Sequence, residues 1–184
     1  MADISKAVTI TRADIRNEAI LQALVPDQDF IFNLAAQTSH VGSMQDPRTD
    51  LAINLEAQLA LLETCRQRNP RARIVFTSTR QIYGRPDYLP VDERHPIRPP
   101  DVNGINKLAA ECYLQLYAEV HGLRGASLRL TNTYGPGMRI KDARQTFIGV
   151  WVRNLVEGKP LRVFGDGRQR RDFTFVEDCV TALL

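Results

Sequence analysis

The fold is decided by the stretch RIVFTS, Arg73-Ile74-Val75-Phe76-Thr77-Ser78, an apolar run that ends in hydroxyl side chains. Nearly continuous apolar runs of this length are typical of strands that are buried in a parallel sheet. Residues 29–35 have the same pattern, and residues 125–130 form a weaker third run. The sequence therefore predicts three short parallel strands.

Helical patterns separate these runs. Residues 50–68 carry apolar side chains at helical spacing and end at Asn69-Pro70, and residues 107–120 form a second amphipathic segment closed by His121-Gly122. This alternation predicts an α/β fold with a doubly wound parallel sheet and helices on both of its faces. Beyond Pro136, a helix over residues 146–157 and a brief strand over residues 161–164 predict a smaller, loop-rich lobe.

Composition narrows the classes of function. The 184 residues suffice for one core, and the net charge of +3 is too small and dispersed to indicate a nucleic-acid partner. No apolar stretch approaches the roughly 20 residues that cross a bilayer, so no membrane partner is expected. Cys65, Cys112 and Cys179 lack metal-ligand spacing, so we expect reduced thiols and no metal site. The N-terminus lacks the pattern of a secretory signal, and the predicted location is cytoplasmic.

Polar or small residues follow two of the predicted strands. Ligands bind beyond the carboxyl ends of the strands in a doubly wound sheet, so these positions are candidate contacts. The run Leu34-Ala35-Ala36-Gln37 would let a flat cofactor approach the backbone, although a packing role is the plain alternative. The three hydroxyls of Thr77-Ser78-Thr79 would suit a ligand, although a turn or cap also uses such residues.

The downstream run Asp101-Val102-Asn103-Gly104-Ile105-Asn106-Lys107 makes the hydroxyl cluster more specific. Asn103 and Lys107 are four residues apart, hence on one face of a helix, and the strand order turns that face towards the hydroxyl strand end. A lysine on a helix is usually only solvated. Its joint occurrence with the hydroxyls, a Tyr-Gly pair and a Pro-Pro turn favours a functional site.

These motifs resemble the extended short-chain dehydrogenase/reductases, the NAD-dependent nucleotide-sugar epimerase and dehydratase family. The resemblance runs from about Asp14 to Leu184 and implies a Rossmann-type fold. Further ordered matches are Asp14-Ile15-Arg16, Phe32-Asn33-Leu34-Ala35-Ala36, Asp46-Pro47, Asn54, Leu128-Arg129-Leu130-Thr131-Asn132-Thr133-Tyr134-Gly135-Pro136, Gly165-Asp166-Gly167, Arg171-Asp172-Phe173 and Asp178.

The resemblance also implies roles for individual residues. Residues 1–135 would be a partial NAD-binding domain, and residues 136–184 a partial substrate-binding lobe. The catalytic positions would be Thr79, Asn103 and Lys107, with Thr79 on the reacting sugar hydroxyl and Lys107 on the nicotinamide ribose. The NAD contacts would be Asp14, Ile15, Leu34, Ala35, Ala36, Gln37, Asn54, Thr77, Ser78, Lys107, Leu130 and Thr131. Asn132 and Arg171 would hold the diphosphate of a nucleotide-diphosphate sugar, and a homodimer through the helices over residues 51–68 and 107–120 is possible.

Two substitutions depart from the family pattern. The family's catalytic tyrosine position is Asn103, and an amide cannot act as the base in a step typically worth 10²–10⁴-fold in rate. The Asp-Glu pair of the 4,6-dehydratases is replaced by Arg80-Gln81, which disfavours dehydration and leaves epimerisation as the better prediction. A phenol of Tyr83 or Tyr88, a water held by Asn103, or Lys107 itself could accept the proton.

A third departure from the family pattern is the glycine-rich loop that binds the pyrophosphate of a dinucleotide. The sequence contains no such loop. We therefore expect a fragment of a longer enzyme or a truncated gene product. Two alternatives stay open: a family member that binds nucleotide sugar or NAD without catalysis, and an inert fragment. His40, His95 and His121 lack partner spacing and are interpreted as surface or capping residues.

Overall fold

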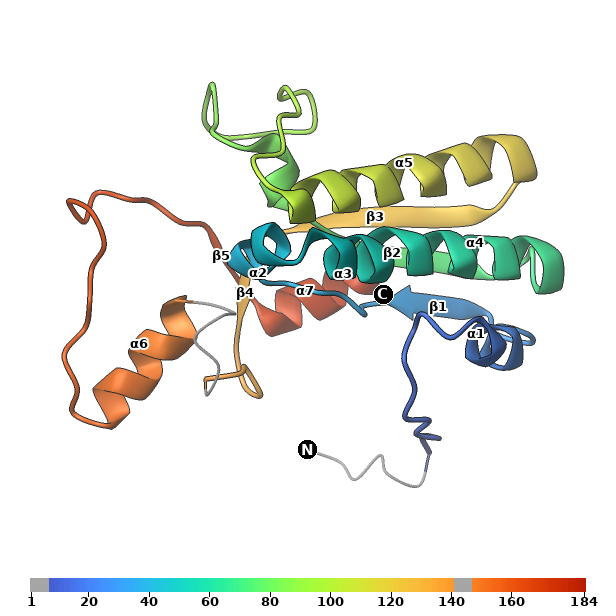
Figure 1. The fold of residues 1–184 in the computed structure, drawn as a ribbon, viewed down its shortest axis with the longest axis horizontal. Coiled ribbons are helices and arrows are strands. Elements are labelled where there is room, and N and C mark those ends of the chain that lie inside the picture. The colour runs from blue at the N-terminus through green and yellow to red at the C-terminus, as the bar shows by residue number, and fades with distance from the viewer. Residues whose placement is uncertain (1–6, 141–146) are drawn as a thin grey trace.

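The computed structural model describes residues 7–140 and 147–184. Its elements are, in chain order, α1 (Glu18–Leu24), β1 (Phe30–Asn33), α2 (His40–Gln45), α3 (Pro47–Leu51), the π-helical turn η1 (Ala52–Glu56), α4 (Ala57–Arg68), β2 (Arg73–Thr79), the 3-10 turn η2 (Arg80–Tyr83), α5 (Val102–His121), β3 (Arg124–Leu130), β4 (Asn132–Tyr134), α6 (Phe147–Val156), β5 (Phe173–Phe175) and α7 (Val176–Leu183). Figure 1 shows their arrangement.

Three parallel strands form the main sheet in the order β1-β2-β3. The register places Thr79 opposite Leu130 and Phe76 opposite Asn33, so the carboxyl ends of the strands lie at one edge. The predicted α/β fold with a parallel sheet is confirmed, with each strand within three residues of its predicted bounds at either end. A second, two-stranded sheet pairs β4 with β5.

The core lies between the sheet and the helices that follow β1 and β2, as the packing of α4 and α5 along the sheet shows (Figure 1). Side chains from α1, α4, β2 and α5 meet there: Leu21, Val25, Leu61, Leu62, Cys65, Ile74, Phe76, Ala110, Leu114, Tyr117 and Leu123. Successive side chains of β2 alternate between buried and half-buried, so one face of this strand is covered more fully than the other. Helices were predicted on both faces of the sheet. One face is fully covered, and the other is covered in part.

Both long helices start earlier than their apolar patterns predicted. The helix expected from residue 50 begins at Pro47, with Asp46 as its cap, and its middle widens into η1. The helix expected from residue 107 begins at Val102, capped by the Asp101 side chain and ended by Gly122 in the left-handed conformation. The periodicity starts late in α5 because its first turn carries polar and glycine residues, and only the cap marks the true start.

The C-terminal part contains one wrong prediction. The strand expected over residues 161–164 is irregular, and Phe164 is 67% exposed, because no described strand lies beside it. The helix expected over residues 146–157 is observed as α6, while residue 146 lies outside the described residues. No helix among the described residues is both long and apolar enough to cross a bilayer.

Candidate active site

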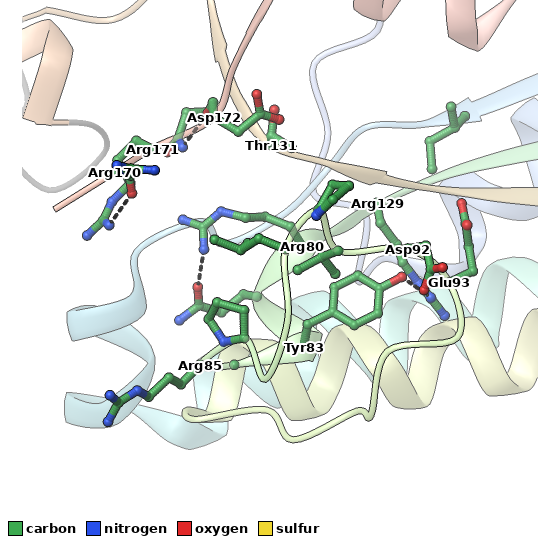
Figure 2. Close-up of a pocket in the computed structure, with 18 of the residues that line it drawn as sticks. Arg80, Tyr83, Arg85, Asp92, Glu93, Arg129, Thr131, Arg170, Arg171 and Asp172 are labelled. Carbon is green, nitrogen blue, oxygen red and sulfur yellow. Dashed lines mark hydrogen bonds between the residues drawn. The ribbon is translucent and has the colours of Figure 1, made fainter.

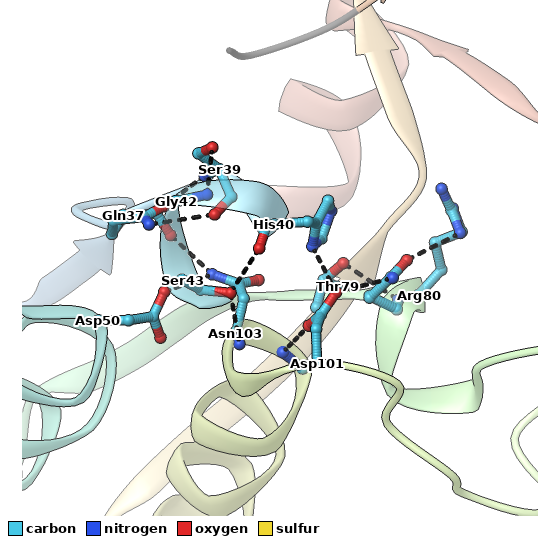
Figure 3. A network of polar contacts seen from close by, with 12 residues as sticks. Gln37, Ser39, His40, Gly42, Ser43, Asp50, Thr79, Arg80, Asp101 and Asn103 are labelled. Carbon is cyan, nitrogen blue, oxygen red and sulfur yellow. Dashed lines mark hydrogen bonds and ion pairs between the residues drawn. The ribbon is translucent and has the colours of Figure 1, made fainter. Parts of the chain in front are cut away.

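The first turn of α5 anchors a polar network at the carboxyl edge of the sheet (Figure 3). The carboxylate of Asp101 accepts the backbone N–H of Gly104 at 2.8 Å through Oδ1, and Gln81 Nε2 donates to its Oδ2 at 3.0 Å. His40 Nδ1 lies 3.1 Å from the same Oδ2. The helix cap therefore also joins α2 and η2 to the start of α5.

Asn103 lies in this turn with its side chain buried and turned into the protein. Its Nδ2 donates to the carbonyl oxygen of Gln37 at 2.8 Å and to Asp50 Oδ2 at 3.2 Å, and its backbone N–H donates to Ser43 Oγ. Both amide hydrogens are therefore used within the fold. The position that the family pattern gives to a tyrosine therefore links α5 to α3 and to the loop after β1. We call these bonds of Asn103 to Gln37 and Asp50 the clasp.

Asp50 is the buried partner that the sequence patterns did not single out. Its side chain is 0% exposed, and its Oδ1 accepts a hydrogen bond from Asn106 Nδ2 at 2.8 Å. Two asparagines of one helix turn thus hold the two oxygens of a single carboxyl group. A buried carboxyl group needs such donors, and the pair Asn103 and Asn106 was the signal available in the sequence.

Lys107 reaches the strand end that bears the hydroxyls. Its Nζ donates to the carbonyl oxygen of Thr77 at 2.8 Å and lies 4.6 Å from the centre of the Phe76 ring. Burial lowers the pKa of this ammonium group to about 8, although the charges of Asp50 and Glu111 oppose the change. The lysine of α5 and the carboxyl end of β2 therefore share one site.

The three hydroxyls differ in their partners. Thr77 Oγ1 donates to the carbonyl oxygen of Asn33 at 3.1 Å, and Thr79 Oγ1 accepts the backbone N–H of Gln81 at 3.1 Å. Ser78 Oγ is buried and has no partner. Thr79 thus caps η2, as the turn-or-cap alternative proposed, while its oxygen stays half-buried at the strand end.

The residues expected along NAD lie around the same edge, apart from those near Asp14. Asn54 Nδ2 donates to the carbonyl oxygen of Gln37 at 3.0 Å, and its Oδ1 is buried without a partner. Leu34 and Ala35 are exposed, and Ala36 is half-buried, so a flat group can approach the backbone there. The unpartnered Ser78 Oγ and Asn54 Oδ1, together with these small residues, fit a polar cofactor such as NAD.

Two pairs of expected NAD contacts are engaged with their neighbours. Asp14 forms an ion pair with Arg16 at 2.6 Å, which lowers the pKa of its carboxyl group to about 2, and Ile15 packs against the core. Leu130 is half-buried at the end of β3, and Thr131 Oγ1 lies 2.7 Å from Thr174 Oγ1.

A cavity of about 1450 Å³ adjoins this edge and holds both residues expected to bind the diphosphate (Figure 2). Asn132 Nδ2 donates to the carbonyl oxygen of Asp172 at 2.8 Å, and Arg171 Nη1 to that of Arg170. Arg80 lines the same cavity, and burial, followed by the charge of Arg171, lowers its pKa. The wall also carries four carboxylates, and among the described residues none of them forms an ion pair with Arg80.

Thr79, Asn103 and Lys107 do not line this cavity themselves. Their neighbours His40, Arg80 and Gln81 do, so the cavity begins one layer of side chains away from the strand end. His40 was expected to be only a surface or capping residue. Its pairing with Asp101 is a feature that sequence spacing did not reveal, because 61 positions separate the two residues.

Neither phenol expected to replace the tyrosine is free. The oxygen of Tyr83 accepts a hydrogen bond from Arg129 Nη1 at 2.5 Å, and Arg129 forms an ion pair with Glu111 at 2.7 Å. The hydroxyl of Tyr88 donates to Asp92 at 2.7 Å, and this bond raises the pKa of Tyr88 to about 12. A phenol with so high a pKa is a poor base near neutral pH.

Comparison with known proteins gives matches over almost the whole chain. The sequence model of the NAD dependent epimerase/dehydratase family matches residues 2–184, which extends the motif resemblance back from Asp14. A putative UDP-glucose 4-epimerase from Methanocaldococcus jannaschii is 32% identical over 183 residues, covering 99% of this chain and 60% of that protein.

Solved structures show the same fold. UDP-glucose 4-epimerase from Thermotoga maritima, solved with UDP-glucose, has a TM-score of 0.91 at 27% identity, covering 97% of this chain and 58% of that one. UDP-glucose 4-epimerase from Thermus thermophilus, solved with NAD, has a TM-score of 0.83 at 30% identity, covering 97% and 61%. These likenesses confirm the predicted Rossmann-type fold, and the chain spans less than two thirds of each of these proteins.

Proposed function

We propose, from the premise that this chain belongs to the NAD dependent epimerase/dehydratase family, that it inverts a hydroxyl-bearing carbon of a nucleoside-diphosphate sugar without net oxidation. The observation that supports the proposal is the hydrogen bond from Lys107 to the carbonyl oxygen of Thr77, which lies beside a cavity lined by Arg80 and Arg171. A cation at the strand end and an anion-binding wall next to it are what a dinucleotide and a sugar diphosphate require.

Each residue has a definite task in this proposal. NAD, when bound, supplies a hydride acceptor that also returns the hydride. Leu34, Ala35, Ala36 and Gln37 border the cofactor, and Ser78 Oγ and Asn54 Oδ1 are free to form hydrogen bonds with it. Lys107 holds the ribose hydroxyls. Thr79 orients the reacting sugar hydroxyl.

Arg171, Asn132 and Arg80 bind the diphosphate of the substrate. Guanidinium groups offer several N–H donors in a fork that matches phosphate oxygens. Burial is the main cause of the lowered pKa of Arg80, and repulsion from the charge of Arg171 adds to it. A bound diphosphate would relieve that repulsion, so anion binding gains free energy from both arginines.

Epimerisation is favoured over dehydration by the residues that follow Thr79. Elimination of water needs an acid and a base near the sugar, and the family's dehydratases place Asp-Glu there. Arg80 and Gln81 occupy these positions, and neither side chain exchanges a proton near neutral pH. The proposed reaction is accordingly an isomerisation.

A second candidate function is binding without turnover. It is favoured by Asn103, whose amide hydrogens are both engaged in the clasp with Gln37 and Asp50, so this residue supplies no base. In that case the protein would sense or carry a nucleotide sugar. The two functions share the binding cavity and differ only in chemistry.

Calorimetric titration with UDP-glucose, followed by product analysis after incubation with NAD, tests the proposal. Arg171→Met should weaken binding at least 10-fold, because a charged hydrogen bond contributes about 1.5–3 kcal/mol. Arg168→Met is the matched control: this exposed arginine of the same segment does not line the cavity, so its affinity should stay within about 2-fold of the unchanged protein. Binding with turnover supports the epimerase, binding alone supports the second candidate, and equal affinity in Arg171→Met contradicts both.

A further inference from the structure

We propose that His40 and Asp101 form the acid–base dyad of this site, with His40 as the proton acceptor that Asn103 cannot be. The inference rests on the proposed function and identifies a residue within the same site. His40 Nδ1 lies 3.1 Å from Asp101 Oδ2, and His40 lines the cavity together with Arg80 and Asn132. A base for the substrate must face this cavity.

The fold holds the dyad from three elements. His40 opens α2 directly after its cap Ser39, Asp101 caps α5, and Gln81 of η2 donates to the same carboxylate oxygen as His40 (Figure 3). The carboxylate of Asp101 is fixed by its cap bond to Gly104. Asp101 Oδ2 is therefore fixed 3.1 Å from the imidazole Nδ1, and its side chain is only 10% exposed.

This geometry selects one form of the imidazole. A carboxylate beside Nδ1 favours the form that carries hydrogen on Nδ1, which leaves a lone pair on Nε2. No described residue forms a hydrogen bond with Nε2, and the His40 side chain lines the cavity and is 45% exposed. Nε2 is therefore available to a sugar hydroxyl, whereas the phenols of Tyr83 and Tyr88 are engaged elsewhere.

The dyad is tied to the substituted position, because Asp101 lies two residues before Asn103 at the start of the same helix. Asn103 clasps α3 and the loop after β1, and that loop leads directly into His40. The residue that replaces the tyrosine thus fixes the segment that carries the new base. In the oxidising half-reaction the sugar O–H and C–H bonds would break and a C=O bond would form: His40 Nε2 would take the proton, and NAD, when bound, would supply the acceptor for the hydride. The reducing half-reaction returns both.

The first test measures the dyad without turnover. Nitrogen-15 NMR of the imidazoles should show His40 with hydrogen on Nδ1, and Asp101→Asn should change this form. Asparagine caps a helix as well as aspartate, so the thermal stability of Asp101→Asn should stay close to that of the unchanged protein. An imidazole of His40 with hydrogen on Nε2, or one that Asp101→Asn leaves unchanged, would overturn the dyad.

The second test measures chemistry and binding together, using a panel of UDP- and dTDP-hexoses with added NAD. His40→Ala should lower kcat at least 100-fold with Kd within about 3-fold, and added imidazole should restore part of the rate. His121→Ala, a matched control at the far end of α5, should keep full activity because its ring packs on Tyr117 and does not line the cavity. Full activity in His40→Ala would overturn the dyad alone. If the unchanged protein binds none of these nucleotide sugars, the proposed function is contradicted, and the proposed role of His40 is contradicted as well.

Discussion

At the scale of single residues, the exchange of tyrosine for asparagine changes the task of position 103 from chemistry to structure. The Asn103 amide bridges a backbone carbonyl oxygen and the carboxyl group of Asp50, all within the protein interior. A buried acceptor that loses its donor costs more free energy than the bond itself contributed. The stability of the fold should therefore depend on Asn103.

We expect Asn103→Ala to lower the free energy of unfolding by about 1–3 kcal/mol, because Asp50 Oδ2 loses its donor, whereas the carbonyl oxygen of Gln37 keeps the donor of Asn54. Urea denaturation followed by circular dichroism measures this change. Asn154→Ala is the control, since within the described part of the chain the Asn154 side chain makes a single long, exposed bond, to Pro160, and its cost should stay below about 0.5 kcal/mol. Equal stability of the two variants would rule out the clasp.

Lys107 gives a prediction for pH. Its pKa is lowered from 10.5 to about 8 in the folded chain, so between these values the unfolded chain binds more protons. The free energy of unfolding should then rise from pH 8 to pH 10.5, by up to about 3 kcal/mol relative to Lys107→Met, which has no such group. Below pH 8 the difference between the two proteins should be constant. Parallel stability curves across the whole range would contradict the burial of the charged amine.

At the scale of elements, much of the fold could be predicted from the sequence, since β1 and β2 have strong apolar patterns, α4 has apolar residues at helical spacing, and β3 has a weaker apolar run. The start of α5 could not, because Asn103 and Gly104 interrupt the pattern and the cap Asp101 is the only local signal. The strand expected over residues 161–164 had the right residue types but no neighbour to pair with. The same limit applies to the site. The hydroxyl cluster and Lys107 could be predicted from their spacing in the sequence. The contacts of His40 with Asp101 and of Asp50 with Asn103 could not, because they join distant segments.

The loop after η2 supplies a prediction at this scale. Gly84 has φ of +68°, and a Cβ there would lie 2.3 Å from the carbonyl oxygen of Arg98, whereas Gly122 has φ of +70° with open space around it. Gly122→Ala should cost about 1 kcal/mol through backbone strain alone. Gly84→Ala should cost at least about 1 kcal/mol more, because the backbone of Arg98 must also move. Thermal unfolding of both variants measures the difference. Equal midpoints would contradict the prediction, because they would mean that the backbone of Arg98 moves away at no cost in free energy.

At the scale of the whole molecule, the outer edge of the sheet is open. Phe30 and Phe32 of β1 and the following Leu34 are exposed, and within the described residues β1 pairs only with β2. Apolar strand edges promote pairing with other chains. The homodimer that the family resemblance implies, through the helices over residues 51–68 and 107–120, stays a prediction alongside this edge.

We expect the 184-residue chain to associate with itself as its concentration rises, through the β1 edge. Sedimentation velocity over a range of concentrations measures this. Phe32→Lys should reduce the association, because a charge on an edge strand opposes pairing. Leu116→Glu changes an exposed apolar residue of α5 instead. Loss of association in Leu116→Glu, with none in Phe32→Lys, would assign the contact to the helices.

The proposed site inverts a sugar carbon by removing and returning one hydride, and proton NMR of the product formed in D₂O tests this most directly. The protein is incubated with NAD and the panel of nucleoside-diphosphate hexoses, and the inverted carbon is examined for deuterium. We predict an inverted product that carries ordinary hydrogen at that carbon, because the hydride never exchanges with solvent. Deuterium at the inverted carbon, or binding of the sugars with no inverted product, would contradict this mechanism.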